Sequence, residues 1–409
     1  MKIFARSYSS KLFVAILYLL IGLVACSFIA RNYGILWLDY LIRFIISTAI
    51  IFFFTAQFLN SKKRSKIQVS VVGIFLLLAT WTLYLHSNQS LLILSAGIWA
   101  YVTALLLFIY LPLNEIATHR KSLVWCSVLF VTIILTWGIY MGYYRLTHPV
   151  LNPNYVGFYI TALYCFFSVL DGRYPIENKS MIFLFFVLSV GIALLGSRSA
   201  AMALLLFSFA FYFENRKMLQ ATAIIFFSIA LYFSFASRGN FIEENIYSGR
   251  GAMVMEYALE EVSITSEKVS INSTAKLLLG EGFGVSTNAI NNVNEIIFNF
   301  TKKIHVVDTN DSGFISVINN GGLILLFYLI FVIIKLLLVT NAPSERPTLF
   351  IYRWGTFIFL GSGILVIALS TPITENFAAS AILFIALSLR YQITNSWKLG
   401  DFKRINSVG

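Results

Sequence analysis

Charged residues are scarce in this sequence. Only 12% of its 409 residues are Asp, Glu, Lys or Arg, whereas 58% are hydrophobic, and the mean hydropathy is +0.81. Soluble globular proteins carry about 25% charged residues. Apolar runs long enough to cross a bilayer recur along the chain, so the composition excludes a soluble domain. It predicts an all-α polytopic membrane protein.

Cysteine and histidine are also rare. The three cysteines, Cys26, Cys126 and Cys165, all lie in apolar runs, which argues against disulfides and against a thiolate metal centre. Neither His148 nor His305 has metal-ligand spacing to another histidine or cysteine. We therefore expect no bound metal and no other cofactor.

Twelve apolar segments are expected to form transmembrane helices. The first shows no small-residue cleavage site of the kind that ends a signal peptide, so we interpret it as a retained helix. The expected spans cover about residues 12–30, 35–59, 67–86, 91–112, 122–144, 155–170, 181–196, 199–213, 218–237, 314–339, 349–369 and 377–396.

The basic residues predict the orientation of these helices. Most of the 30 Lys and Arg residues fall in segments that share one side of the membrane if the N-terminus is cytoplasmic. By the positive-inside rule, both termini are then cytoplasmic. The same rule accounts for the net charge of +12, so this charge does not predict nucleic-acid binding.

A long polar interval, residues 238–313, interrupts the apolar pattern and holds ten of the 18 acidic residues. It separates the expected helices of residues 1–237 from the last three helices and a short tail in residues 314–409. The charge rule places the interval outside, as one large loop that contains short helices. So large a water-facing segment is unusual in a chain this apolar. Our first hypothesis is therefore that the segment contains the functional site.

Arg198 is the single residue that most clearly indicates a functional site. It lies in Gly196-Ser197-Arg198-Ser199, a short turn between two expected spans on the outer side. An arginine in this position serves either as an anion ligand or as an anchor that reaches the interface, and its position fits both readings.

Arg250 follows Ser248-Gly249 and precedes a predicted amphipathic helix over about residues 251–262. A helix start with an arginine beside it suits phosphate, because free N–H groups and the guanidinium both meet oxyanions. An ordinary surface arginine fits the same pattern. The glycines at 280, 282 and 284 have no strand–helix–strand context, so they indicate a turn that brings the backbone close to a ligand or a helix.

The interval ends in Asp308-Thr-Asn-Asp311-Ser-Gly313. This run matches the first half of an EF-hand loop, but the twelfth position is Asn319 rather than Glu, so we reject calcium. Asp311 is either a helix cap or a catalytic carboxylate. In the second span, Asp39 and Arg43 form an i,i+4 pair, which fits an intramembrane site as well as a pair that orients the helix.

Together these pieces resemble the O-antigen polymerase and O-antigen ligase superfamily of bacterial envelope proteins. The likeness covers the topology of the whole chain and four short motifs in order. They are Asn152-Pro-Asn154-Tyr-Val-Gly157, Gly196-Ser-Arg198-Ser-Ala200, Ser248-Gly-Arg250 with the later Gly280-x-Gly-x-Gly284, and Asp311-Ser-Gly-Phe ending in Asn320-Gly-Gly-Leu-Ile324.

The resemblance implies glycosyl transfer in the inner membrane, at its periplasmic face. A growing glycan would leave undecaprenyl diphosphate and join the next undecaprenyl-diphosphate-linked repeat unit, with a chain-length regulator as a further partner. In this reading Arg198 and Arg250 hold the diphosphates and Asp311 takes or orients the acceptor proton. The candidates for further contributions are Arg145, Asn154, His305 and Asp308.

Two alternatives remain at this point. Ligases attach finished glycan to lipid A-core, and their motif resembles His-Asn at the position where this chain has Asp311-Ser312. The end of the long loop therefore favours a Wzy-type polymerase. A flippase for lipid-linked oligosaccharides would need ionisable groups spread through its spans. Here, apart from Asp39 and Arg43, these groups collect at the outer face, which favours an enzyme.

Overall fold

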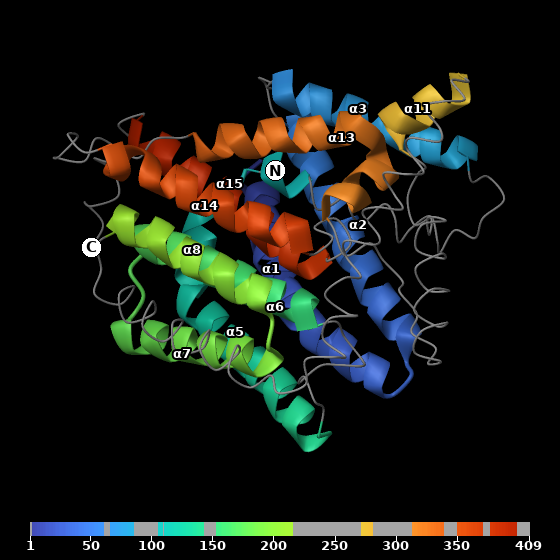
Figure 1. Cartoon of the computed structure of the whole chain (residues 1–409). Helices are drawn as coiled ribbons and strands as arrows, with labels where there is room; N and C mark the ends of the chain where they lie inside the picture. The colour runs from blue at the N-terminus through green and yellow to red at the C-terminus, as the bar shows by residue number, and fades with distance from the viewer. Residues whose placement is uncertain are drawn as a thin grey trace.

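The computed structural model describes residues 2–60, 66–85, 105–108, 110–142, 153–215, 271–280, 313–338, 350–370 and 377–398 (Figure 1). In this part of the chain all regular secondary structure is helical, and no strand occurs. The prediction of an all-helical protein is confirmed for these residues.

The described helices follow the apolar pattern. They are α1 (Lys2–Asn32), α2 (Leu36–Asn60), α3 (Lys66–Leu85), the short 3-10 helix η1 (Leu106–Phe108), α5 (Leu113–Tyr140), α6 (Pro153–Arg173), α7 (Asn178–Leu195), α8 (Arg198–Asn215), α11 (Ile271–Leu279), α13 (Gly313–Leu337), α14 (Phe350–Ser370) and α15 (Phe377–Lys398). The expected span 218–237 and most of 91–112 lie outside the described residues.

Membrane-crossing character is clear for part of this set. Within α1, α2, α5, α6 and α7, 5 segments are long and apolar enough to cross a membrane. Shorter apolar helices occur within α3, α8, α13, α14 and α15. The described part of the chain is therefore a bundle of membrane-type helices, and one of them, α13, is broken at Gly322 by a non-helical backbone conformation.

Several helices extend beyond the apolar runs that predicted them. The expected span 122–144 corresponds to α5, which already begins at Leu113, so Arg120 and Lys121 lie on a helix rather than in a connection. Likewise, α1 begins at Lys2 rather than near residue 12. Hydropathy marks the part of a helix that suits a lipid core, whereas Lys, Arg and Glu continue a helix into the interface at little cost.

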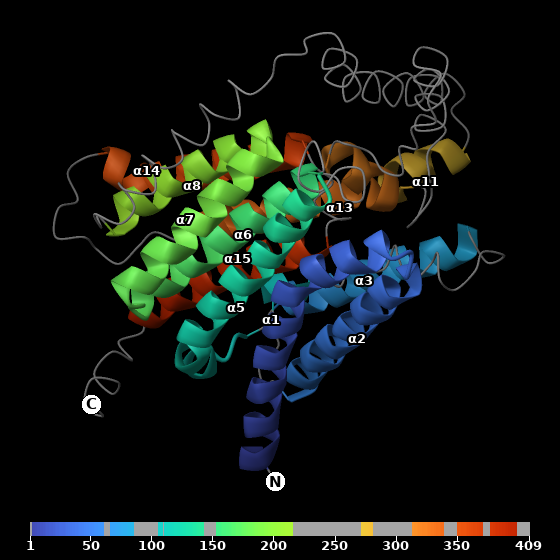
Figure 2. The ribbon, with the colours of Figure 1, turned by 90° about the horizontal axis from the view of Figure 1, so that it is seen from below.

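The centre of the bundle is formed by α6 and α15 (Figure 2). In α6, 89% of the apolar window is buried inside the protein, far more than in the other candidate spans. Large aromatic side chains of α6, among them Tyr159, Tyr164 and Phe167, are fully buried. The helix α14 packs along α8, and α7 and α8 both pack against α6. Both ends of α6 are therefore anchored in a closely packed core.

Contacts between helices fix the two ends of this bundle. The helices α1 and α5 run in the same direction, since Ser10 bonds to Glu115 near their starts and the Tyr33 and Trp137 rings lie 5.9 Å apart near their ends. The start of α5 meets the end of α6, where Lys121 pairs with Glu177 at 3.2 Å. We call this the Lys121 end, and we call the opposite one, where α6 and α8 begin, the Arg198 end.

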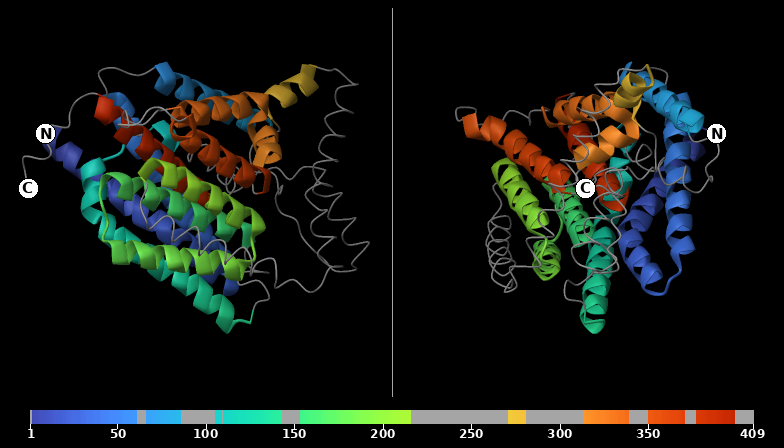
Figure 3. Two further views of the ribbon diagram at one scale, coloured as in Figure 1. Left: turned by 60° about the vertical axis from the view of Figure 1, so that its left-hand side comes forward. Right: turned by 45° about the vertical axis from the view of Figure 1, so that its right-hand side comes forward.

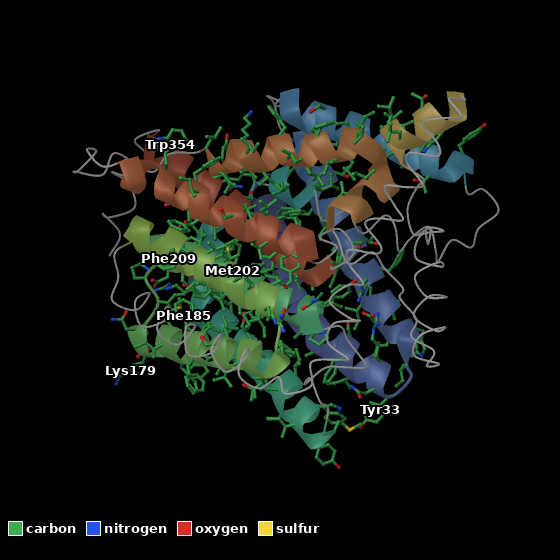
Figure 4. All side chains as sticks on the ribbon, viewed as in Figure 1. Tyr33, Lys179, Phe185, Met202, Phe209 and Trp354 are labelled. Atoms are coloured by element: carbon green, nitrogen blue, oxygen red, sulfur yellow. The ribbon has the colours of Figure 1, made fainter. Side chains whose placement is uncertain are left out.

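Figure 4 shows the two ends through labelled side chains, with Tyr33 at the α1–α2 turn and Lys179 at the start of α7. The α1–α2 turn therefore belongs to the Arg198 end, and the start of α7 to the Lys121 end. This arrangement agrees with helices that alternate in direction along the chain.

Candidate functional site

The site at the Arg198 end is built on the turn between α7 and α8. Gly196 ends α7 in the left-handed conformation, with φ 62° and ψ 28°, and its N–H donates to the Ile192 and Ala193 carbonyls. A glycine ends the helix here without the steric cost that a Cβ would carry. Ser197 then caps α8, since its Oγ accepts a hydrogen bond from Ala200 N at 3.4 Å. Arg198 is the first residue of α8, and its side chain is exposed.

Ser197 also ties this turn to the start of α6. Its Oγ donates to Asn154 Oδ1 at 2.9 Å, and Ser197 is only 1% exposed. Asn154 is the second residue of α6, directly after Pro153. The two motifs that carry Asn154 and Arg198 are far apart in the sequence, and this hydrogen bond joins them.

Close backbone contact between α6 and α8 depends on Gly157. A Cβ at this position would lie 2.7 Å from the Ala200 Cβ and 3.1 Å from Ser197 Oγ, closer than such atoms normally approach. One turn further along α6, Thr161 Oγ1 donates to the Gly157 carbonyl at 2.7 Å. The small residues of both motifs therefore serve to bring two helix starts together.

The starts of α6 and α8 meet at one corner of the bundle, beside Arg198. The electrostatics of this corner favour an anion. A helix N-terminus carries a partial positive charge, and here the N-termini of α6 and α8 lie side by side. Neither of these two described first turns contains an acidic residue. Arg198, the first residue of α8, adds a full positive charge to this helix start. A guanidinium beside helix N-termini suits phosphate oxygens.

A second charged group lies at the same end, around Asp39. This carboxylate is 2% exposed and accepts hydrogen bonds from Ser27 Oγ at 2.6 Å and from Arg43 at 2.9 and 3.1 Å. Arg31, on α1, forms a third ion-pair contact at 3.5 Å. The sequence left two readings for Asp39 and Arg43. The contacts of Asp39 with Ser27 and Arg31 also join α2 to α1, so the cluster links the two arms of the α1–α2 hairpin, which neither reading included.

The structure locates part of the predicted site. It brings Asn154 to the Arg198 turn, as described above. The other candidates, Arg145, Arg250, His305, Asp308 and Asp311, lie outside the described residues, as does the expected helix at 251–262. Asp311 precedes the first residue of α13, Gly313, by two positions.

Sequence reasoning missed two features of this end. The ion pair of Arg31 with Asp39 was not predicted, although Arg31 and Asp39 stand only eight positions apart, on either side of the turn between the first two expected spans. Gly157 was noted within a motif, but its contact with Ala200 needs the helix packing, which no single sequence displays.

The fold and site define a helical membrane-type bundle with a positively charged corner at one end. Among the described residues, no three His, Cys, Asp or Glu side chains gather where they could hold a metal ion. No protein-family model matches the sequence, and no curated protein matches it significantly.

Proposed function

We propose that this protein is an O-antigen polymerase of the bacterial inner membrane. In this proposal the chain crosses the membrane twelve times, both termini are cytoplasmic, and residues 238–313 form a large periplasmic loop. The observation that carries it is the junction of Asn154, Ser197 and Arg198. Two motifs that resemble those of O-antigen polymerases meet there and give a positively charged corner at one end of the bundle.

The proposed reaction moves a glycan between two lipid carriers. A hydroxyl oxygen of the incoming repeat unit attacks the anomeric carbon of the growing glycan, and the bond from that carbon to the diphosphate oxygen breaks. Undecaprenyl diphosphate leaves with the electron pair of the broken bond. The hydroxyl proton passes to a base, a role that we assign to Asp311. No electron is gained or lost, and no nucleotide is consumed.

Arg198 has a defined task in this reaction. The leaving diphosphate gains negative charge as the anomeric bond breaks, and a fixed guanidinium at its oxygens stabilises that charge. The N-termini of α6 and α8 add to this effect because their dipoles are already aligned. We assign the same task to Arg250, while Arg145, Asn154, His305 and Asp308 contribute to binding.

The distribution of buried charge favours an enzyme over a flippase. The buried charged residues of the described part of the chain are Asp39, Asp171 and Arg390. Two of the three lie at helix ends, Asp39 near the α1–α2 turn and Asp171 near the end of α6, whereas Arg390 lies in the second half of α15, within its apolar segment. A path for an anionic oligosaccharide carrier would need such groups midway along the helices.

The deletion phenotype separates polymerase from ligase. A strain without the polymerase still caps lipid A-core with a single repeat unit, because its ligase remains, so a lipopolysaccharide gel shows core plus one band. Asp311→Asn should give the same pattern if Asp311 is the base, whereas a capping role would tolerate Asn and keep the ladder. Bare core with stranded lipid-linked polymer would instead identify a ligase.

A further inference from the structure

Three charged side chains at the α1–α2 hairpin form a cluster in which the positive charges outnumber the negative one. Asp39 of α2 accepts hydrogen bonds from Arg43 Nε at 2.9 Å and from Arg43 Nη2 at 3.1 Å. Arg31 Nη2, on α1, lies 3.5 Å from Asp39 Oδ2. We call these three residues the Arg31 cluster. Two guanidinium groups share one carboxylate there, so the cluster as a whole is positively charged.

Arg31 is the member of this cluster that has capacity for a further ligand. Its side chain is 34% exposed, against 18% for Arg43, and its contact with Asp39 is the longer one. Within the described part of the chain, the buried Arg31 Nε has no hydrogen-bond partner. A guanidinium presents several N–H donors in a planar fork that matches phosphate oxygens. Arg31 can therefore donate to a phosphate group while it remains paired with Asp39.

Exposed aromatic residues flank the Arg31 cluster. Tyr33 and Trp37, which stand between Arg31 and Asp39 in the sequence, are 63% and 66% exposed. The Tyr33 ring also lies 5.9 Å from the ring of Trp137, near the end of α5. Exposed Trp and Tyr side chains at the ends of membrane helices are typical of the level of lipid headgroups. The diphosphate of a lipid carrier lies at that level.

The Arg31 cluster lies at nearly the same depth as the corner where α6 and α8 begin. Tyr159 of α6 donates to the Ile21 carbonyl of α1 at 2.5 Å, which aligns these two antiparallel helices. Toward the Arg198 end, Ser27 lies six residues (27 − 21) beyond this contact and Asn154 lies five (159 − 154). At about 1.5 Å per residue, the two are about 9 and 7.5 Å from it. Ser27 donates to the carboxylate of the cluster at 2.6 Å, so the cluster and the corner share one level.

The two positive sites at this level are separated sideways. Figure 3 shows the α1–α2 hairpin on one side of the bundle and α8 on the other. The proposed reaction needs two such sites, because both lipid carriers bring a diphosphate and two diphosphates repel each other. The leaving diphosphate gains charge and suits the corner with its helix N-termini. The acceptor keeps its diphosphate and reacts through a glycan hydroxyl, so its diphosphate can be held at a distance from the corner.

We propose that the Arg31 cluster binds the diphosphate of the acceptor lipid, and this inference rests on the proposed function. Arg31 is the residue that donates to the phosphate oxygens. Asp39 orients the Arg31 guanidinium, and its negative charge also lowers the affinity of the cluster for an anion. Removing the arginine and removing the carboxylate charge therefore have opposite effects on binding.

Lipid binding to purified variants tests this opposition. The full-length protein in detergent is titrated with undecaprenyl diphosphate, and native mass spectrometry counts the bound lipids; phosphatidylglycerol is the competing anionic lipid. The variants are Arg31→Ala and Asp39→Asn. The matched control is Lys121→Ala, which removes one positive charge from the exposed ion pair with Glu177 at the opposite end. Thermal unfolding and the initial rate of glycan elongation are measured on the same samples.

The wild type should bind two molecules of undecaprenyl diphosphate, and excess phosphatidylglycerol should displace neither. Arg31→Ala weakens one of the two about 10-fold to 100-fold, the effect of losing a hydrogen bond to a charged group. It raises the apparent KM for the lipid-linked repeat unit by a similar factor. Asp39→Asn unfolds at a lower temperature but binds both lipids at least as tightly, because the competing charge is gone. Lys121→Ala binds as the wild type does.

Three outcomes would overturn the inference. Unchanged binding in Arg31→Ala would show that this arginine does not hold a diphosphate, and weakened binding in Asp39→Asn would reduce the cluster to a structural role. Displacement by phosphatidylglycerol would identify a general contact with anionic lipids.

Failure of the proposed function gives a different result. A wild-type protein that binds undecaprenyl diphosphate through Arg31 but makes no polymer would refute the polymerase and support the diphosphate site. Polymer formation with binding that is independent of Arg31 would refute the site alone.

Discussion

Arg198 and Ser197 are neighbours with different environments. Ser197 is buried and its hydroxyl bonds to both α6 and α8, whereas the Arg198 side chain is exposed at the rim of the same corner. The buried serine therefore stabilises the turn, and the exposed arginine lies beside it. We expect the hydrogen bonds of Ser197 to keep the turn in place when the arginine is removed.

We expect Arg198→Ala to lower the rate of polymerisation by about 100-fold to 1,000-fold, the usual effect of losing one preorganised group at a developing oxyanion. Arg198→Lys should recover little of this rate, because an ammonium cannot make the paired hydrogen bonds of a guanidinium. Lys179→Ala is the matched control, since Lys179 is also exposed and lies at the Lys121 end. Normal lipopolysaccharide ladders from Arg198→Ala would exclude the assigned role.

We expect substitution of Asp39 to lower the stability of the fold more than it lowers activity. Its carboxylate is buried between Ser27, Arg31 and Arg43. Removing one partner of a fully buried ion pair costs about 3–5 kcal/mol. We expect a smaller cost here, because the Arg43 and Arg31 side chains that remain are 18% and 34% exposed.

Asp39→Asn should therefore lower the thermal unfolding temperature of the detergent-solubilised protein clearly. Arg43→Ala should destabilise more than Arg31→Ala, since Arg43 makes two hydrogen bonds and Arg31 a single 3.5 Å contact from a more exposed side chain. A wild-type unfolding temperature in Asp39→Asn would contradict the view that this cluster fixes the α1–α2 hairpin.

The site depends on the contact between the helices α6 and α8. Helix interfaces in membranes use small residues because close backbone approach, rather than water exclusion, holds the helices together. Gly157, Ser197 and Ala200 form such a contact here. The contact places two helix N-termini side by side, which neither helix could do alone.

Gly157→Ala should separate the two helices and cost about 1–3 kcal/mol of stability, the usual cost of overpacking. It should also lower polymerisation, because Arg198 would move away from the start of α6. Gly361→Ala on α14 is a suitable control, since its Cβ would meet Leu337 at 3.6 Å, an ordinary contact. If both variants retain wild-type stability and activity, the close contact has no role in the site.

The sequence predicted the existence of helices better than it predicted where they end, bend or contact one another. Apolar runs gave the positions of α1, α2, α7 and α14, because burial in lipid or core needs hydrophobic residues in either case. The early start of α5 was missed, since its first turns carry Glu115, Arg120 and Lys121. The break at Gly322 was also missed, because the pair Gly321-Gly322 alone cannot show that the backbone of α11 lies against the bend.

The site was predictable only where a short motif already carried its chemistry. Arg198 stood out because few residues separate two apolar runs there. Its bond network with Asn154 depends on how α6 and α8 pack, which is a property of the folded bundle. The same limit explains why the hydrogen bond from Trp81 of α3 to the Gly280 carbonyl was not foreseen, since 199 positions separate the two residues.

At the scale of the whole molecule, the two ends of the bundle differ in chemistry. The Lys121 end carries exposed basic residues such as Lys121 and Lys179, whereas the Arg198 end carries Asn154, Arg198 and the Asp39 cluster. We propose that the Lys121 end faces the cytoplasm and the Arg198 end the periplasm. This orientation follows the positive-inside rule, and with it the proposed site faces the periplasm.

Cysteine labelling in whole cells tests this orientation. In a background without Cys26, Cys126 and Cys165, single cysteines at positions 33 and 267 should react with a membrane-impermeant maleimide, and those at 63 and 179 should react only after lysis. Tyr33 is exposed at the Arg198 end, and Lys179 is exposed at the other end. Labelling at 63 and 179 in intact cells, without labelling at 33 and 267, would invert the proposed topology.

The central claim is that this chain alone joins lipid-linked repeat units into polymer. The direct measurement uses purified protein in lipid vesicles with a single undecaprenyl-diphosphate-linked repeat unit as both donor and acceptor, and no nucleotide sugar. The account predicts a ladder of lipid-linked glycans that grows by whole repeat units and releases one undecaprenyl diphosphate per linkage, with little product from Arg198→Ala. A wild-type protein that leaves the single repeat unit unchanged, or transfers it only when lipid A-core is added, would contradict it.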